Sequence, residues 1–336
     1  MKGNHRWMAV VLLLALSCKK EIKQSVPSDQ TSNNIVPCGN TWVHLPDFSF
    51  KAANPIMVYN NKAYFFSYIP GQAKQVAIFD GTNWEVIDSD IPIESISGNN
   101  NFSFVIGNRG YVGRSQYPGS HPLYRYLFDT NQWDKLEDFP GPERGGVAVF
   151  TIGNDGYIAG GKTTVNPLVY FSQLWRYNTL TDTWTEEEGF LASARRAAAT
   201  GFGINGAGYV ATGAYNTVLY KTMMKYNPAA INPWTNAATF PGAGRSGAVN
   251  FVINGKAYVG AGASAEGHHI DFYKYDPAID EWTRIADAPS GQGYISKAFS
   301  LNGKGYVVRV PEPGIIRMDK YIPPFCFTGV SSASNP

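Results

Sequence analysis

Charge and cysteine are both scarce in this chain of 336 residues. Asp, Glu, Lys and Arg make up 16% of the sequence, below the roughly 25% typical of globular domains, and there are 3 cysteines. Beyond the N-terminus no apolar run is long enough to cross a bilayer as a helix. The low charge argues against a helical protein with salt-bridged faces, and the few cysteines argue against a small domain with many disulfides. The lack of a long apolar run beyond the N-terminus argues against a helical membrane protein.

The first residues read as an export signal. Lys2 and Arg6 precede an apolar run over residues 8–16, which is too short for a membrane span but has the length of a signal-peptide core. Cys18 follows in a setting that resembles a bacterial lipoprotein signal. The resemblance implies a signal peptide over 1–17 and lipid on Cys18, in an exported protein of the cell envelope, held at the outer membrane on its periplasmic or outer face. Simple secretion with cleavage nearby is the alternative.

The mature chain would be close to neutral. Removing Lys2 and Arg6 leaves 26 basic residues against 26 acidic ones. We therefore expect no nucleic-acid partner, and membrane contact only through the lipid on Cys18. Residues 18–37 are polar and poor in aromatics, which indicates a flexible tether, and residues 327–336 are expected to form a tail of a monomeric protein.

Two aromatic series repeat along the chain about every fifty residues. One series is Trp42, Trp84, Trp133, Trp184, Trp234 and Trp282. The other is Tyr64, Tyr111, Tyr157, Tyr209, Tyr258 and Tyr306. Each Tyr follows a turn rich in Asn and Gly, which tolerate the positive φ of tight hairpins, and further short apolar runs follow it. Four short strands per repeat, six times over, predict an all-β, six-bladed propeller.

The order of residues within these repeats resembles the kelch repeat. A Gly pair follows the Tyr, then an aromatic residue precedes Asp or Asn, and then comes the Trp. Gly160-Gly161 is an intact pair, whereas Thr212-Gly213 and Gly260-Ala261-Gly262 are relaxed copies. The resemblance covers about residues 40–325. It implies the fold more strongly than any function, since sialic-acid mutarotases and galactose oxidase both carry kelch propellers.

The ring is expected to close through its N-terminal strand. Trp42 precedes the first Tyr of the series, and no Trp follows Tyr306, so residues 40–46 should complete the last blade and remove an open edge. The propeller would then occupy residues 38–326. Its blades are predicted at about 47–88, 98–137, 144–187, 196–237, 245–286 and 293–321 plus 40–46.

Two cysteines fall at this predicted seam. Cys38 precedes the closing strand, and Cys326 follows the last blade. In an exported protein, two thiols brought together favour a disulfide, which would stabilise the ring by about 2–5 kcal/mol. Two buried free thiols are the alternative.

A cationic register lies thirteen residues before the Tyr of each repeat. Four of its six positions are Lys51, Arg144, Arg196 and Arg245. They stand at the entrance to the innermost strand of their blades, so we predict that they ring one mouth of the central channel. The loops between second and third strands should open on the same face. These loops carry Tyr117, His121, Tyr170, Phe171, Tyr215, His268 and His269.

The register has two interpretations. Each Arg could be a framework residue that donates hydrogen bonds to loop carbonyls. Alternatively, several guanidinium groups converge on a concavity, where they suit carboxylates. The resemblance supports the second interpretation, because kelch domains that bind acidic peptides use Arg at this register and kelch mutarotases bind an acidic sugar.

The sequence shows no metal, cofactor or catalytic constellation. His268 and His269 are adjacent and have no third ligand nearby, and neither a nucleophile elbow nor a phosphate loop occurs. We therefore expect a binding module that captures a glycan or an acidic ligand on one propeller face. The alternatives are a mutarotase or isomerase of an acidic sugar, and a scaffold for another envelope protein.

Overall fold

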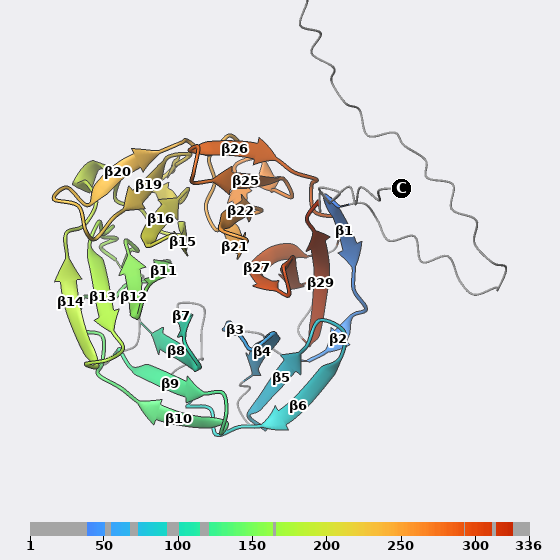
Figure 1. Cartoon of the computed structure of the whole chain (residues 1–336). Helices are drawn as coiled ribbons and strands as arrows, with labels where there is room; N and C mark the ends of the chain where they lie inside the picture. The colour runs from blue at the N-terminus through green and yellow to red at the C-terminus, as the bar shows by residue number, and fades with distance from the viewer. Residues whose placement is uncertain are drawn as a thin grey trace, which may run out of the picture. The chain divides into compact units, whose positions relative to one another are not determined.

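A computed structural model describes residues 39–50, 55–67, 73–92, 101–114, 121–163, 166–291, 293–310 and 314–324. Six antiparallel sheets stand around a central opening, with the first strand of each blade innermost (Figure 1). The one helical element in these ranges is a 3-10 turn at Ala192–Ala194. The predicted all-β, six-bladed propeller is confirmed. The same ranges contain no helix that is both long and apolar enough to span a membrane.

The blades have nearly uniform strands. Blade 1 is β3 (Ile56–Tyr59), β4 (Lys62–Ser67), β5 (Gln75–Phe79) and β6 (Trp84–Asp88). Blade 2 is β7 (Asn101–Ile106), β8 (Arg109–Arg114), β9 (Leu123–Leu127) and β10 (Gln132–Lys135). Blade 3 is β11 (Ala148–Ile152), β12 (Asp155–Ala159), β13 (Leu174–Asn178) and β14 (Thr183–Glu187).

Blades 4 and 5 carry an extra small hairpin between their second and third strands. Blade 4 is β15 (Thr200–Ile204), β16 (Ala207–Ala211), β19 (Met223–Tyr226) and β20 (Trp234–Ala237), with hairpin β17 (Ala214–Tyr215) and β18 (Val218–Leu219). Blade 5 is β21 (Val249–Ile253), β22 (Lys256–Gly260), β25 (Phe272–Asp276) and β26 (Glu281–Arg284), with hairpin β23 (Ala263–Ser264) and β24 (Gly267–His268).

Blade 6 joins the two ends of the ring. It consists of β27 (Tyr294–Leu301), β28 (Lys304–Val310) and β29 (Ile315–Ile322), completed by β1 (Thr41–His44), while β2 (Phe48–Ser49) also pairs with β29. In the β1–β29 register Thr41 lies opposite Ile322 and His44 opposite Asp319. Closure by the N-terminal strand is thus confirmed. The predicted signal peptide, tether, tail, lipidation site Cys18 and the Cys38–Cys326 pair lie outside the described residues.

The repeated aromatic residues lock neighbouring strands and blades together. In five blades the Tyr ring stacks on a Phe of the innermost strand, as Tyr258 does on Phe251 with centroids 5.0 Å apart. In five blades the Trp indole donates its N–H to the segment that follows the preceding blade's outer strand. Trp42 does this across the seam, to the carbonyl of Ala286 at 2.9 Å. The two series are therefore packing devices.

The glycine pairs connect each blade to the next. Both positions of the pair have positive φ, and in the relaxed copies Thr212 and Ala261 adopt it at the first position. The second position is glycine each time. A Cβ on Gly161 would lie 2.9 Å from a methyl of Val147, and the Gly161 N–H donates to the Arg196 carbonyl of the next blade at 2.9 Å. Only glycine combines this φ with so close an approach.

Candidate functional site

The register arginines are buried inside their own blades. Arg144, Arg196 and Arg245 expose 0%, 2% and 0% of their surface. Arg245 donates to the carbonyls of Ala243 and Ala261 at 2.9 and 3.0 Å and forms a bidentate pair with Asp271 at 2.6 and 2.9 Å. Burial raises the pKa of Asp271, but the hydrogen bonds and charge of Arg245 outweigh it and hold that pKa below its usual value.

Arg144 and Arg196 follow the same plan with neutral partners. Each donates to a carbonyl two residues earlier and to one sixteen residues later. Each also donates to the side chain of the residue just before the third strand, which is Gln173 at 2.6 Å for Arg144 and Thr222 at 3.0 Å for Arg196. Burial lowers the pKa of both arginines to about 10, so they stay charged at neutral pH.

These contacts support the framework interpretation of the register. Each guanidinium ties the entrance of the first strand to the segment between the second and third strands. Lys51, the fourth cation of the register, lies outside the described residues. Sequence reasoning missed a fourth buried guanidinium, that of Arg309 in β28, which donates to Asp319 at 2.9 Å and to the carbonyls of Gly293 and Pro289. The sequence did hold a signal for this group: blade 6 lacks the register arginine but carries Arg309 and Asp319 on its second and third strands.

The predicted loop residues meet in pairs and do not form one cluster. Phe171 stacks under Arg144, with 4.1 Å between guanidinium and ring, and Tyr170 packs edge-on against Tyr215 at 4.9 Å. The other contacts are local: His121 with the Phe139 carbonyl, His268 on the ring of Tyr294, and His269 with the Ser264 hydroxyl. Tyr117 lies outside the described residues.

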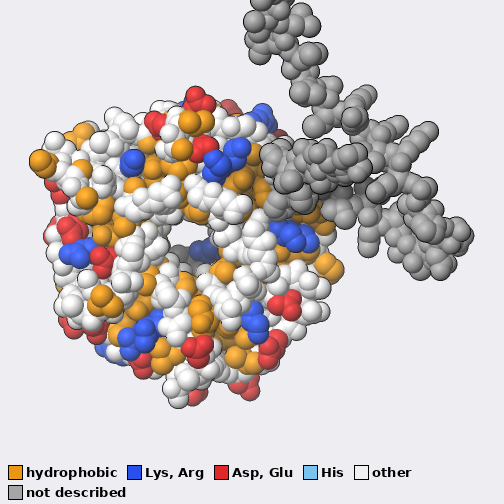
Figure 2. Space-filling view, in the orientation of Figure 1, with side chains coloured by type: hydrophobic (Ala, Val, Ile, Leu, Met, Phe, Trp, Pro, Cys, Tyr) orange, Lys and Arg blue, Asp and Glu red, His pale blue; other side chains and the backbone are white. Residues whose placement is uncertain are grey.

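The concavity predicted on this face is the mouth of the central channel. It is a cavity of about 320 Å³ lined by the first strands of all six blades, near the ends at which those strands begin. Figure 2 shows the channel open at the centre of the ring, with a basic side chain visible inside it. The described lining residues are Pro55, Ile56, Asn101, Phe102, Ser103, Val147, Val149, Ala199, Thr200, Gly201, Ala248, Val249, Asn250, Ser296, Lys297 and Ala298.

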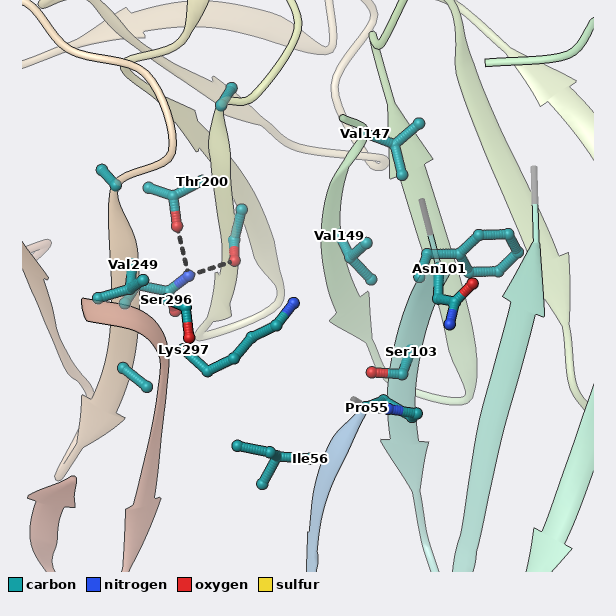
Figure 3. Close-up of a pocket in the computed structure, with 16 residues that line it drawn as sticks. Pro55, Ile56, Asn101, Ser103, Val147, Val149, Thr200, Val249, Ser296 and Lys297 are labelled. Carbon is teal, nitrogen blue, oxygen red and sulfur yellow. Dashed lines mark hydrogen bonds between the residues drawn. The ribbon is translucent and has the colours of Figure 1, made fainter. Parts of the chain in front are cut away.

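Lys297 is the cation of this cavity. Its side chain extends from β27 into the space, with Asn101 and Ser103 on the opposite side (Figure 3). A β-bulge between Ile295 and Lys297 interrupts the β27–β28 register, and such bulges re-aim side chains. Burial lowers the pKa of Lys297 below its usual value. Among the described residues no carboxylate or other group pairs with its ammonium.

Two asparagines of the cavity differ in their hydrogen bonding. The Asn250 amide donates to the Thr200 hydroxyl at 2.6 Å and to the Gly201 carbonyl at 2.9 Å, as Figure 3 shows. The amide nitrogen and oxygen of Asn101 are both buried and have no partner within the described part of the chain. A buried amide without partners is costly unless something else satisfies it. Among the described residues of the mouth, Asn101 therefore has a buried amide without a partner, and Lys297 is a half-buried cation without one.

The deeper half of the channel is more apolar. A second cavity of about 430 Å³ follows the same six strands toward their other ends, and the phenylalanines that stack on the repeat tyrosines contribute to its walls. None of its described lining residues is titratable. A polar ligand would therefore be held at the mouth, where Lys297 and Asn101 lie.

Comparisons with known proteins agree with this architecture. The chain is 34% identical over 87 residues to N-acetylneuraminate epimerase of Vibrio cholerae and 32% identical over 104 residues to that of Vibrio vulnificus. These segments cover 24% and 28% of this chain and 22% and 25% of the relatives. Kelch-like protein 21 of Rattus norvegicus is 36% identical over 61 residues, which are 18% of this chain and 10% of that protein.

A solved structure titled "Structure of YjhT" matches at the level of the fold, with a TM-score of 0.53, 18% identity, and 65% of this chain and 73% of that one covered. The chain is a kelch-type β-propeller. No family model matches this propeller. Its alignments span a quarter or less of the length of the curated relatives.

Within the described residues, the channel mouth is a place where a polar amide without a partner and an unpaired ammonium border space for a ligand. Among the described residues no group of three His, Cys, Asp or Glu side chains could hold a metal ion. The channel mouth instead combines an ammonium, an amide and hydroxyls. These groups can bind a small polar molecule and are suited to one that carries a single negative charge.

Proposed function

We propose that this kelch propeller is a binding module for a small acidic saccharide, held in the channel mouth. The observation that carries the proposal is the cavity of about 320 Å³ in which Lys297 and both amide atoms of Asn101 lack partners among the described residues. Its size is at the lower end of the range for ligand pockets, which fits a monosaccharide. The similarity to two N-acetylneuraminate epimerases supports an acidic sugar as the first candidate.

A mutarotase or epimerase of an acidic sugar is the second candidate, and the names of the two Vibrio relatives favour it. Such a reaction needs an acid and a base beside one sugar. Lys297 is the one titratable side chain among the described lining residues, so we place binding first. Proton NMR of freshly dissolved N-acetylneuraminate separates the two: an enzyme would accelerate interconversion of the anomers, whereas a binding module would leave its rate unchanged.

The proposal includes export and a lipid on Cys18, on the basis of the N-terminal sequence. Metabolic labelling with an alkyne fatty acid should mark the wild-type chain and not Cys18→Ala. Equal labelling of both chains would refute the anchor and leave the channel proposal intact.

Calorimetric titration tests the binding site itself. N-acetylneuraminate and galacturonate should bind the wild type. Val149→Trp, which fills the mouth from β11, should weaken binding at least tenfold, and so should Ser103→Tyr from β7. Val86→Trp is the matched control, because Val86 lies on an outer strand and is 43% exposed. Undiminished binding by the folded mouth variants would refute the site, and so would failure of the wild type to bind either acid.

A further inference from the structure

We propose that Lys297 is the anchor for a single carboxylate of the ligand, with Asn101 and Ser103 on the facing wall hydrogen-bonding its amide or hydroxyl groups. This inference rests on the proposed function and deepens it, because it names the charged group that the site requires. It assigns the ligand to the class of monocarboxylates.

The surroundings of Lys297 leave one place for a counter-charge. The ammonium lies in a cavity whose other described lining residues are all uncharged, and no described ion pair includes it. Lys297 is half-buried, so its ammonium loses part of its hydration without gaining a partner, and a carboxylate in the cavity would offset that cost. Because the described lining offers one positive charge, it matches one negative charge and not a phosphate dianion or a polyanion.

The facing wall supplies the second half of the recognition. Asn101 has a donor and an acceptor, both buried without a described partner, so its amide must turn toward the cavity to reach a ligand; Ser103 lies beside it on β7 and is half-buried. Figure 3 shows these side chains across the cavity from Lys297. A ligand that bridges the two walls therefore needs a carboxylate at one end and a group that both donates and accepts hydrogen bonds at the other. An acetamido group or a pair of hydroxyls meets that requirement.

The same placement makes binding depend on pH. The carboxylate needs the ammonium form of Lys297, and no other described residue lining either channel cavity titrates. Burial lowers the pKa of Lys297, so affinity should fall at a lower pH than an exposed lysine would allow. Since the group is a base, affinity is retained on the acid side of its transition and lost as the pH rises.

The experiment compares N-acetylneuraminate with its methyl ester, which keeps the shape and removes the charge. The wild type should bind the acid at least tenfold more tightly than the ester at pH 7. Lys297→Met should lower affinity for the acid to that for the ester and leave affinity for the ester unchanged. Lys221→Met, at an exposed lysine, is the matched control and should behave as the wild type. A retained preference for the acid in Lys297→Met would overturn the anchor while the saccharide site stands.

A second measurement does not depend on sugar binding. In protein with 13C-labelled lysine, the Lys297 resonance is the one that disappears in Lys297→Met. It should shift saturably on addition of acetate, while the Lys221 resonance does not. If no saccharide binds but this shift occurs, the proposed function fails and the carboxylate site stands. A Lys297 resonance that does not respond to acetate would overturn the site.

Discussion

Blades 3 to 5 and the remaining blades use the same strand positions differently. In blades 3 to 5 the register arginine is buried and hydrogen-bonded, and two polar side chains of the channel mouth, Asn250 and Thr200, pair with each other. Blades 2 and 6 have glycine at the register position in the sequence. These two blades supply Asn101 and Lys297, two polar residues of the channel mouth that have no described partner.

Within one repeating architecture, blades 3 to 5 thus provide the structural framework, and blades 2 and 6 provide the polar groups proposed to bind the ligand. Where the repeat is regular, the register arginines form hydrogen bonds within their blades, and the channel mouth receives no charged side chain from the described residues of these blades. Where the repeat has degenerated, polar groups face the channel mouth without such bonds. A buried group left unsatisfied in a native fold calls for an explanation, and the proposed ligand would provide one here.

The largest expected effect comes from substituting the buried register arginines. Arg245→Ala should lower the free energy of unfolding by about 3–5 kcal/mol, because it leaves the Asp271 carboxylate buried without its partner. Arg144→Ala should cost less, about 1–3 kcal/mol, because its partner Gln173 is neutral. Urea denaturation at pH 7 measures both. Saccharide affinity of the folded variants should not change, and a specific loss of affinity would reverse the assignment of these arginines to the framework.

Urea denaturation at acidic pH tests the role of the Asp271 carboxylate in this stability difference. The folded-state pKa of Asp271 is lowered, so the pair stabilises the protein above the usual pKa of 3.8 and loses its contribution as the pH falls through the folded-state value. The stability gap between wild type and Arg245→Ala should therefore narrow below pH 4. A gap independent of pH would show that the carboxylate is not involved.

The two channel asparagines should respond in opposite directions. Asn250→Ala removes two hydrogen bonds and leaves the Thr200 hydroxyl and the Gly201 carbonyl unpaired, at a cost of about 1–2 kcal/mol. Asn101→Ala removes an amide with no described partner and should leave stability unchanged or raise it by up to about 1 kcal/mol. Thermal unfolding without ligand measures the stability of both variants. Equal losses of stability would contradict the distinction between the hydrogen-bonded Asn250 and Asn101, which has no described partner.

The smallest effect is expected at Lys297. In the absence of ligand, Lys297→Met should stabilise the protein by up to about 1 kcal/mol at pH 7, because it removes a half-buried cation that has no described partner. The folded-state pKa lies below the usual 10.5, so the unfolded chain holds more protons between the two values and wild-type stability rises with pH there. The advantage of the variant should therefore vanish near pH 10.5. Denaturation curves from pH 7 to 10.5 that stay parallel would contradict this.

The fold could be predicted from the sequence because the residues that determine it recur in every repeat. Six aromatic pairs in step, with Asn-Gly turns between them, predict six sheets, and the unmatched Trp42 predicts how the ring closes. The register arginines were placed correctly at the first-strand entrances. Their burial was not readable, because each partner stands 26 to 29 residues away in sequence, just before the third strand, and differs in chemistry from blade to blade.

The groups that face the channel mouth escaped sequence analysis for the opposite reason. Lys297 and Asn101 belong to no repeating pattern, and a lysine in a strand usually points to solvent. What directs Lys297 inward is a bulge in β27, a local irregularity that hydrophobic alternation does not reveal. The sequence did hold one signal. Lys297 is charged, whereas the residues at the same distance before the repeat Tyr of the other five blades are uncharged.

The β1–β29 register also determines how the ring responds to force. Thr41 and Ile322, opposite each other at one end of the pair, are the points at which the chain enters and leaves the closed ring. A pull that separates them loads one backbone pair at a time, from Thr41–Ile322 toward His44–Asp319, and does not shear the whole strand at once. Unless the predicted Cys38–Cys326 disulfide joins the two ends, the strand pair would therefore open residue by residue, and the hydrogen bond from the Trp42 indole to Ala286 would resist the opening.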